Sequence, residues 1–215
     1  MTDFDTAGTT VETFLNDLAS GESTPGGGAA AALTGSQAAA LLSMVLNFSV
    51  GRKKYAAVED ELRGHLLRTE RMRAELLTLA DKDAEAFGAV AACFAMPRST
   101  EEERAARTKS MQAALRGAAE VPFEIATLCA DLLEVTAPVA EKGNSNVVSD
   151  AATAAHLAQA ALNSALVNVD INLKWLKDES YVSKKQAEVA ALRASAEKNY
   201  AVARTACTRA LGVEI

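Results

Sequence analysis

The feature that most constrains the fold is a stretch without any charged residue, from Ser23 to Gly51. A membrane span needs about 20 predominantly apolar residues, so the length alone raises that question. The stretch is built mainly from Ala, Gly and Ser, however, contains Gln37 and Asn47, and has no partner segment elsewhere that could span with it. We therefore predict a central helix, Ala29 to about Val50, that is apolar on every side because other helices surround it.

The composition favours helices over a sheet. With 49% apolar residues among 215, the chain can bury a core without disulfides, metals or a second domain. Aromatic residues make up only 5% and alanine runs recur, which favours helices packed closely through small residues. Prolines occur only at positions 25, 97, 122 and 138, so long helices are allowed. We predict one all-α domain, residues 1–215, formed by a bundle of about six helices around the Ala-rich one.

A long third helix is predicted from about Ala56 to Ala95, and Pro97 ends it. Apolar residues recur along it at steps of three, four and seven, which is the spacing of one helix face. We expect this face to point into the core. Its residues are Val58, Leu62, Leu66, Met72, Leu76, Leu79, Phe87, Val90 and Phe94.

The remaining helix boundaries are predicted from caps and breakers. Ser, Thr, Asp and Asn side chains satisfy free amide groups at a helix start, whereas Pro and Gly interrupt or end helices. The predicted elements are a fourth helix from the capping box of Thr100 and Glu103 to Gly143, kinked or broken at Pro122, a fifth from Ser149 or Asp150 to about Leu176, and a sixth from about Val182 to Leu211.

The charge balance limits the partners. A net charge of −6 argues against nucleic acid, because phosphate binding needs concentrated positive charge on one face. An anionic ligand would instead need a local basic cluster, and the compact candidate is Arg52, Lys53 and Lys54. The first ten residues lack the basic and apolar regions of a signal peptide, so we expect a soluble, cytoplasmic protein that does not bind membranes.

The cysteines and histidines do not suggest a metal site. Cys93, Cys129 and Cys207 are widely spaced among alanines and leucines, which is typical of reduced core residues. His65 and His156 lie far apart, each without a nearby second ligand, and no HExxH motif is present. We expect neither a metal nor a tightly bound cofactor.

Three consecutive glycines, Gly26 to Gly28, follow Thr24 and Pro25 directly before the central helix. Glycine costs backbone entropy, which is repaid where the bare chain must approach something closely. The run could be a cradle of N–H groups at a positive helix N-terminus, which suits an anionic or carbonyl-rich ligand. It could equally be a tight turn.

Asp81 and Asp83 lie two positions apart, so on a helix they point about 200° from one another. Asp83 falls in the apolar stripe between Leu79 and Phe87. A carboxylate there costs several kcal/mol unless it is paired or hydrogen-bonded. Catalysis is one explanation, and a buried ion pair with a neighbouring helix is the other.

Asn168 and Asn172 lie one turn apart on the fifth helix, on the side of Trp175. Asparagine is a poor helix former with many hydrogen-bonding atoms, so the pair indicates a polar seam inside the bundle. Ligand contact and bonding between helices both explain it.

Taken together, these stretches resemble the cyclodeaminase and cyclohydrolase family of folate enzymes. The matching strings follow the family's order and approximate spacing, which makes chance agreement improbable. They are Thr24-Pro25-Gly26-Gly27-Gly28, Asn47 to Tyr55, Asp81 to Phe87, Gly143-Asn144-Ser145-Asn146 with Ser149-Asp150-Ala151, and Asn168 to Leu173.

The resemblance implies an all-helical homodimer acting on tetrahydrofolate that carries a one-carbon unit. It implies a carboxylate base and a basic cluster that holds the glutamate carboxylates of the folate tail. The resemblance covers both aspartates, and because periodicity places Asp83 in the apolar stripe, Asp83 is the first choice and Asp81 the second. Asparagines and Asp150 would read the pterin, and the glycines would line the pocket. The expected substrate-binding residues are Pro25, Gly26, Gly27, Gly28, Asn47, Arg52, Lys53, Lys54, Tyr55, Asn144, Asn146, Asp150 and Asn172.

Two reactions are known in this family. One hydrolyses 5,10-methenyltetrahydrofolate to the 10-formyl form, and the other closes 5-formiminotetrahydrofolate to the methenyl form and releases ammonia. Bifunctional members carry a formiminotransferase domain for which 215 residues leave no room, so we favour the cyclohydrolase. The cyclodeaminase is the alternative, and a helical dimer that binds folate without turnover is the alternative from another class.

The lack of clustered ligands predicts that catalysis needs no metal. Activity should survive exhaustive chelation at an unchanged rate, measured after dialysis against a strong chelator with elemental analysis of the same sample. A stoichiometric metal whose removal abolishes turnover would contradict this expectation.

Overall fold

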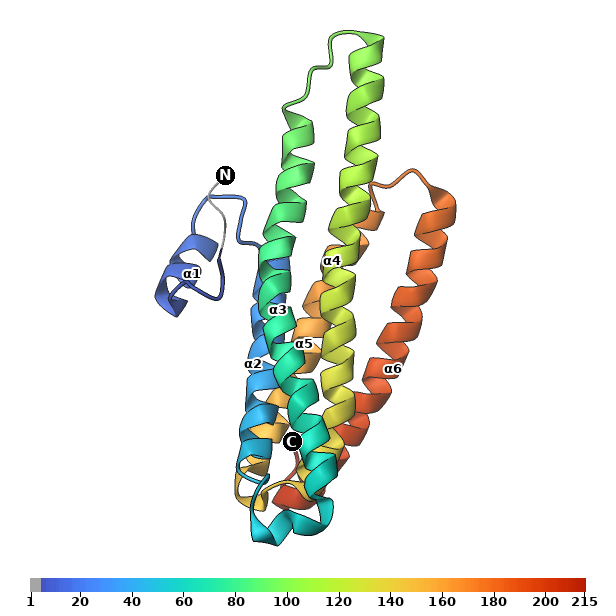
Figure 1. Cartoon of the computed structure of the whole chain (residues 1–215). Helices are drawn as coiled ribbons and strands as arrows, with labels where there is room; N and C mark the ends of the chain where they lie inside the picture. Colours follow the sequence, from blue (N-terminus) through green and yellow to red (C-terminus); the bar gives the residue numbers. More distant parts are fainter. Residues whose placement is uncertain (1–4) are drawn as a thin grey trace.

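The computed structural model describes residues 5–215, and within that range the chain contains helices and no strands (Figure 1). Long helices lie side by side, and the short first helix lies beside the bundle, near the start of α2. The predicted all-α bundle is confirmed. The elements are α1 (Val11–Leu18), α2 (Gly27–Asn47), η1 (Lys53–Val58), α3 (Glu59–Phe94), α4 (Glu101–Lys142), η2 (Ser145–Val147), α5 (Val148–Leu173) and α6 (Glu179–Leu211), where η1 and η2 are 3₁₀-helices.

Helix α2 forms the predicted central element and packs against α3, α4 and α5. Among the helices of residues 5–215, only α2 is long and apolar enough to cross a membrane by length and composition. However, 61% of its most apolar stretch is buried inside the bundle. We had expected other helices to cover α2 on every side, and this expectation was wrong. Gln37, Ala40 and Asn47 are exposed, so one stripe of α2 has no helix over it.

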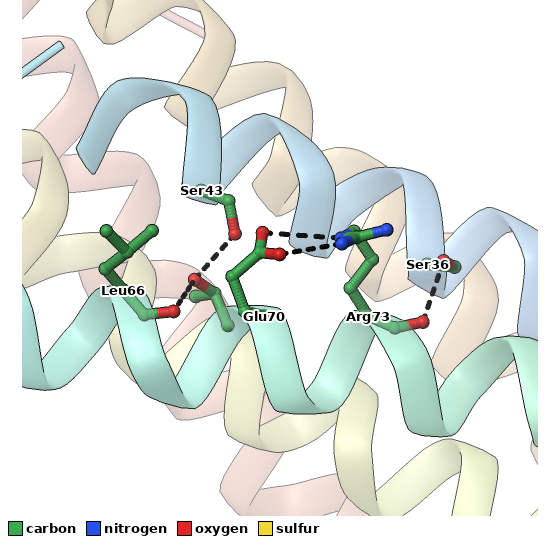
Figure 2. Close-up of polar contacts among 6 residues, drawn as sticks. Ser36, Ser43, Leu66, Glu70 and Arg73 are labelled. Carbon is green, nitrogen blue, oxygen red and sulfur yellow. Dashed lines mark hydrogen bonds and ion pairs between the residues drawn. The ribbon is translucent and has the colours of Figure 1, made fainter. Parts of the chain in front are cut away.

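Small residues let α2 approach its neighbours closely. A Cβ atom at Gly35 would lie 2.8 Å from the Cys129 Sγ atom and 3.3 Å from the Leu76 methyl groups. The polar side chains of α2 on this side find partners on α3 (Figure 2): Ser36 Oγ donates to the Arg73 carbonyl oxygen at 3.0 Å, and Ser43 Oγ lies 2.8 Å from Thr69 Oγ1. The interface between α2 and α3 therefore leaves these buried hydroxyls satisfied.

Helix α4 begins with the predicted capping box of Thr100 and Glu103 and ends at Gly143. Of the kink or break expected at Pro122, the break does not occur, because α4 runs as one helix through Pro122 and Pro138. Proline removes the hydrogen bond to the carbonyl four residues earlier, which for Pro122 is that of Ala118. That carbonyl instead accepts a hydrogen bond from Asn172 Nδ2 on α5 at 2.9 Å. A side chain from a neighbouring helix thus replaces the lost backbone bond.

Two further expectations about the helices were wrong. Neither Ser149 nor Asp150 caps α5; both lie inside its first turn, and Val147 at the N-cap position makes no side-chain bond. The helix ends at Leu173 rather than near Leu176 because the chain then turns into the loop before α6.

The inward stripe of α3 is also shorter than the pattern predicts. Phe87 and Phe94 are 43% and 65% exposed, whereas Leu62, Met72, Leu76 and Leu79 are fully buried. Helices α3 and α4 extend beyond the start of α2, so the last turns of α3 have no central helix to pack against (Figure 1).

Replacing Gly35 with alanine should destabilise the fold by about 1 to 3 kcal/mol, because the added methyl group overlaps buried side chains on two helices. Gly64, in α3, is the matched control because a Cβ there meets nothing within 4 Å. Gly64→Ala should stabilise the protein by up to about 1 kcal/mol. Urea unfolding followed by circular dichroism measures both, and equal effects would refute close packing at Gly35.

Candidate active site

A cavity of about 830 Å³ lies above the first turn of α2, between α3, α4 and α5. Glycines and polar side chains gather at one part of its wall, and aromatic and cationic side chains at another. The wall includes Gly26, Gly27, Gly28, Asp83, Phe87, Phe94, Arg107, Gln112, Asn168, Asn172, Trp175 and Lys177.

Asp83 projects from α3 against the N-terminus of α2. A Cβ atom at Gly28 would lie 2.1 to 2.4 Å from three atoms of the Asp83 carboxyl group, so only glycine at position 28 admits the carboxylate. The Ala29 backbone N–H donates a hydrogen bond to it. The glycine run therefore allows the Asp83 side chain of the same protein to approach the backbone closely.

The Asp83 carboxyl group is partly buried, and no Lys, Arg or His of residues 5–215 forms an ion pair with it. Burial raises its pKa to about 6, against the opposing effect of the Ala29 hydrogen bond. A carboxyl group with a pKa this close to neutrality can accept and return a proton at physiological pH. The buried ion pair that we considered as the alternative for Asp83 is not found within the described chain.

Asn168 and Asn172 both reach the cavity, and both also bind backbone. Asn172 Nδ2 donates to the Ala118 and Asn168 carbonyls at 2.9 and 2.8 Å, and Asn168 Nδ2 donates to the Ser164 carbonyl at 2.9 Å. Asn172 Nδ2 uses both of its N–H groups in these bonds, whereas Asn168 Nδ2 uses one of its two. Both amides can therefore offer a ligand their side-chain oxygens as acceptors, and Asn168 can also offer one donor. Both explanations of this polar seam, ligand contact and bonding between helices, are therefore compatible with the structure.

The rest of the cavity was not predicted from the sequence. Phe94 and Trp175 expose large apolar surfaces, and Arg107 and Lys177 add two cations. The Arg107 Nε atom donates to the Cys93 carbonyl at 2.9 Å, which fixes the guanidinium beside the end of α3. In the sequence, Phe87 and Phe94 read as part of the inward face of α3, and nothing local distinguishes Arg107 from other charges on α4.

Asp81 points away from the cavity. Its Oδ1 atom accepts hydrogen bonds from the Thr6 backbone N–H at 2.9 Å and the Thr6 hydroxyl at 2.6 Å. The side chain therefore attaches the segment before α1 to α3. Of the two aspartates, Asp83 alone lines the cavity.

The other predicted substrate-binding residues lie at the opposite end of α2. Its 21 residues separate Gly27 from Asn47 by about 30 Å. Pro25 is buried beside the cavity end, and Gly26, Gly27, Gly28 and Asn172 line the cavity itself. The residues at the far end are Asn47, Arg52, Lys53, Lys54, Tyr55, Asn144, Asn146 and Asp150.

Part of this far group stabilises the turn after α2. The Asn144 backbone N–H donates to Ser49 Oγ at 2.8 Å, its Nδ2 donates to the Phe48 carbonyl at 3.2 Å, and its Oδ1 accepts from the Asn146 N–H at 3.0 Å. Tyr55 is buried, whereas Arg52, Lys53 and Lys54 are exposed. Within one chain, the basic cluster cannot contact a ligand whose reacting atom lies at Asp83.

The described residues contain no group of three His, Cys, Asp or Glu side chains arranged to hold a metal ion. All three cysteines are free and buried. Burial raises the pKa of the Cys129 thiol to about 12 and that of Cys207 to about 11, so neither is a thiolate nucleophile at neutral pH.

Comparisons with known proteins place the chain in a family. Residues 10–191 match the family model described as formiminotransferase-cyclodeaminase. The chain is 44% identical to a methenyltetrahydrofolate cyclohydrolase from Methylorubrum extorquens over 87% of this chain and 90% of that protein. It is 31% identical to the rat formimidoyltransferase-cyclodeaminase over 88% of this chain, which spans 35% of that protein.

A solved structure has the same fold. The crystal structure of formiminotetrahydrofolate cyclodeaminase from Thermotoga maritima superposes with a TM-score of 0.85 at 33% identity, covering 94% of this chain and 98% of that one. The likeness therefore extends over nearly the whole bundle, including the helices that form the cavity.

The environment of Asp83 predicts a stability effect with a defined pH dependence. The pKa of Asp83 rises from 3.8 to about 6 on folding. Ionisation of Asp83 therefore does not lower the free energy of unfolding below about pH 4, and lowers it progressively between about pH 4 and pH 6. Asp83→Asn should therefore stabilise the protein at pH 7.5, by at most roughly 3 kcal/mol, and leave it nearly unchanged at pH 4.

Asp81→Asn is the control for this measurement. It weakens the charge-assisted hydrogen bonds from Thr6 and should lower stability by about 1 kcal/mol at pH 7.5. Thermal melting at the two pH values measures both variants. A loss of several kcal/mol in Asp83→Asn at pH 7.5 would identify Asp83 as a structural residue instead.

Proposed function

The chain belongs to the formiminotransferase-cyclodeaminase family, and we propose that it is an enzyme of folate one-carbon metabolism that hydrolyses 5,10-methenyltetrahydrofolate to 10-formyltetrahydrofolate. Support for the hydrolysis comes from the 44% identity to a methenyltetrahydrofolate cyclohydrolase, which aligns over 90% of its length. The formimidoyltransferase-cyclodeaminases are less similar, and this chain spans only about a third of their length.

The observation that carries the proposal is the position of Asp83, an unpaired carboxyl group with a pKa near neutrality on the wall of a cavity large enough for a folate. The substrate is an amidinium cation, so an anionic carboxylate stabilises it by charge. The same carboxylate can act as general base toward a water molecule beside the cationic carbon. No other carboxylate lines this cavity in the described chain.

The proposed reaction balances with Asp83 as the only proton carrier. Water adds to the methenyl carbon and loses a proton to Asp83, which gives a neutral tetrahedral adduct between N5 and N10. The adduct collapses as its hydroxyl becomes the formyl carbonyl, the bond from carbon to N5 breaks, and N5 takes up a proton. One proton is released overall, as required when a cation and water give a neutral product.

The remaining lining residues suit the rest of the substrate. The side-chain oxygens of Asn168 and Asn172 can accept hydrogen bonds from the N–H groups of the pterin. Phe87, Phe94 and Trp175 offer apolar surface for the aminobenzoyl ring. The polar head would thus lie near Asp83 and the aromatic linker along the last turns of α3.

Cyclodeamination is the second candidate, favoured by the likeness to the Thermotoga maritima cyclodeaminase. In that reaction, N10 attacks the formimino carbon on N5, and ammonia leaves after accepting a proton. A carboxyl group with a pKa near 6 can transfer these protons as well. The two reactions therefore share one site and differ in what leaves the tetrahedral carbon.

Two properties complete the proposal. The protein acts in the cytoplasm, where the folate pool of one-carbon metabolism is found, and it functions as a homodimer without a tightly bound cofactor. The uncovered stripe of α2 supports association of two copies, because apolar and uncharged helix faces favour contact with another protein surface.

The purified protein should hydrolyse methenyltetrahydrofolate faster than it cyclises formiminotetrahydrofolate. Each substrate is offered separately, the methenyl form is followed by absorbance, and ammonia is measured in parallel. Ammonia release at the higher rate would assign the cyclodeaminase reaction, and turnover of neither substrate would refute the proposed function.

Asp83→Asn should lower the turnover number by about 10² to 10⁴ fold, because it removes the base while keeping the size of the side chain. Asp81→Asn, which does not reach the cavity, should retain most of the activity. In the unmodified enzyme, the turnover number should rise with pH through about 6 as Asp83 loses its proton. A flat pH profile, or equal loss in both variants, would contradict the role of Asp83.

A further inference from the structure

The loop between α5 and α6, residues 174–178, carries two residues of the cavity wall, Trp175 and Lys177. It passes beside α4, on which Gln112 also lines the cavity (Figure 1). Backbone in a connecting loop has no regular hydrogen-bonding partners, so loops are usually the more mobile parts of a fold. A loop that forms part of a binding wall therefore needs other contacts to fix it.

Gln112 bonds to this α5–α6 loop with both ends of its side-chain amide. Its Nε2 atom donates to the Trp175 carbonyl oxygen at 3.0 Å, and its Oε1 atom accepts from the Lys177 backbone N–H at 2.6 Å. Leu176, the residue between these two bonds, packs against a small apolar cluster formed by Val90, Leu115 and Ala118 of α3 and α4. The loop is therefore held to α4 through its backbone and to the bundle through one apolar side chain.

The next two turns of α4 hold the end of the loop and the start of α6. Arg116, four residues after Gln112, forms an ion pair with Asp178 at 2.6 Å, and its guanidinium carbon lies 4.3 Å from the centre of the Tyr181 ring. Glu120, four residues further, accepts a hydrogen bond from the Tyr181 hydroxyl. Residues four apart share one face of a helix, so a single face of α4 makes all these contacts. Gln112 is the member of this face that holds the part of the loop at the cavity.

Trp175 is the largest side chain that the loop contributes to the cavity. Its side chain is 63% exposed, and Phe94 and Phe87 on the same cavity are 65% and 43% exposed. Aromatic surfaces gathered on one cavity suit a ligand with a planar ring, because stacked or edge-to-face contacts remove both partners from water. The two phenylalanines are fixed by helix α3, whereas the position of the Trp175 indole depends on the loop and hence on Gln112.

We propose that Gln112 is a positioning residue, which holds the α5–α6 loop so that the Trp175 indole receives the aminobenzoyl ring of the substrate. This inference rests on the proposed function, because it concerns the aromatic part of that substrate. The chemistry at Asp83 lies on another helix, so the loop contributes to binding. Contacts made equally in the ground state and the transition state lower KM and leave the turnover number unchanged.

Gln112→Ala should therefore raise KM by about tenfold, since two hydrogen bonds that order the loop are lost, and change the turnover number by less than about twofold. Arg116→Ala, at a position outside the described cavity wall, should raise KM by a smaller factor. Arg68→Ala is the matched control, because Arg68 joins α3 to Glu134 and Asp131 of α4 and contacts neither the loop nor the described cavity wall. An unchanged KM in Gln112→Ala, or a loss confined to the turnover number, would overturn the proposal.

A double-mutant cycle tests whether Gln112 acts through Trp175. In a Trp175→Ala background, Gln112→Ala should have little further effect on KM, because the side chain that it positions is absent. A full effect in that background would show that Gln112 acts on the substrate directly and would overturn the proposal. Competition extends the test: Gln112→Ala should weaken inhibition by tetrahydrofolate but not by 6-methyltetrahydropterin, which lacks the aminobenzoyl ring. Equal weakening of both inhibitors would contradict the assigned ring contact.

The position of the loop can also be followed without substrate, because Trp175 is the single tryptophan of the chain. Time-resolved fluorescence anisotropy should decay faster and to a lower residual value in Gln112→Ala than in the unmodified protein, and Arg68→Ala should leave it unchanged. Circular dichroism verifies that each variant is folded. The same anisotropy in Gln112→Ala and the unmodified protein would overturn the positioning role, whereas inactivity of the unmodified enzyme toward both folates would refute the proposed function instead.

Discussion

The contact between the Asp83 carboxyl group and the bare backbone at Gly28 is the constraint on which the site depends. The first turn of α2 must present glycine there, because any Cβ atom would overlap the carboxyl group. The same contact places the carboxylate at a helix N-terminus, where the Ala29 N–H stabilises its charge, while burial opposes that charge more strongly. The balance between the two effects gives a pKa near neutrality, which a proton-transfer residue requires.

A second link joins site and scaffold through Asn172. Pro122 in the middle of α4 leaves the Ala118 carbonyl without its helical hydrogen bond, and the Asn172 side chain supplies a replacement from α5. The Asn172 amide, which lines the cavity, is therefore held in place by the carbonyl that Pro122 leaves free on α4. Its orientation is determined by backbone chemistry, which leaves its oxygen positioned as an acceptor before any ligand arrives. The charge-free helix α2 is likewise two-sided, since one side forms the core and the other is exposed.

The sequence determined the helical class, the central Ala-rich helix and two unusual features, a glycine run before that helix and an aspartate in an apolar stripe. The contact between these two features was found only in the structure. These conclusions follow from local rules: periodicity, the absence of proline and the cost of burying a charge. The helix caps were less predictable, as Ser149 and Asp150 show, because several polar residues near a helix start can each serve as a cap. The course of α4 through Pro122 could not be predicted from its own sequence, since the compensating donor lies 50 residues later, on another helix.

The tertiary structure alone decided which residues belong to one site. Asp81 and Asp83 match the family pattern equally well, and helical periodicity favoured Asp83 as the inward one. The packing of α3 showed where each side chain goes, Asp81 to Thr6 and Asp83 to the cavity. Phe87, Phe94 and Arg107 read as core or surface residues in sequence, but they line the cavity because α3 and α4 extend past the start of α2. The separation of the basic cluster from Asp83 likewise follows from the length of α2. Sequence patterns record which residues a helix carries, whereas the distance between two of them is set by how the helices are arranged.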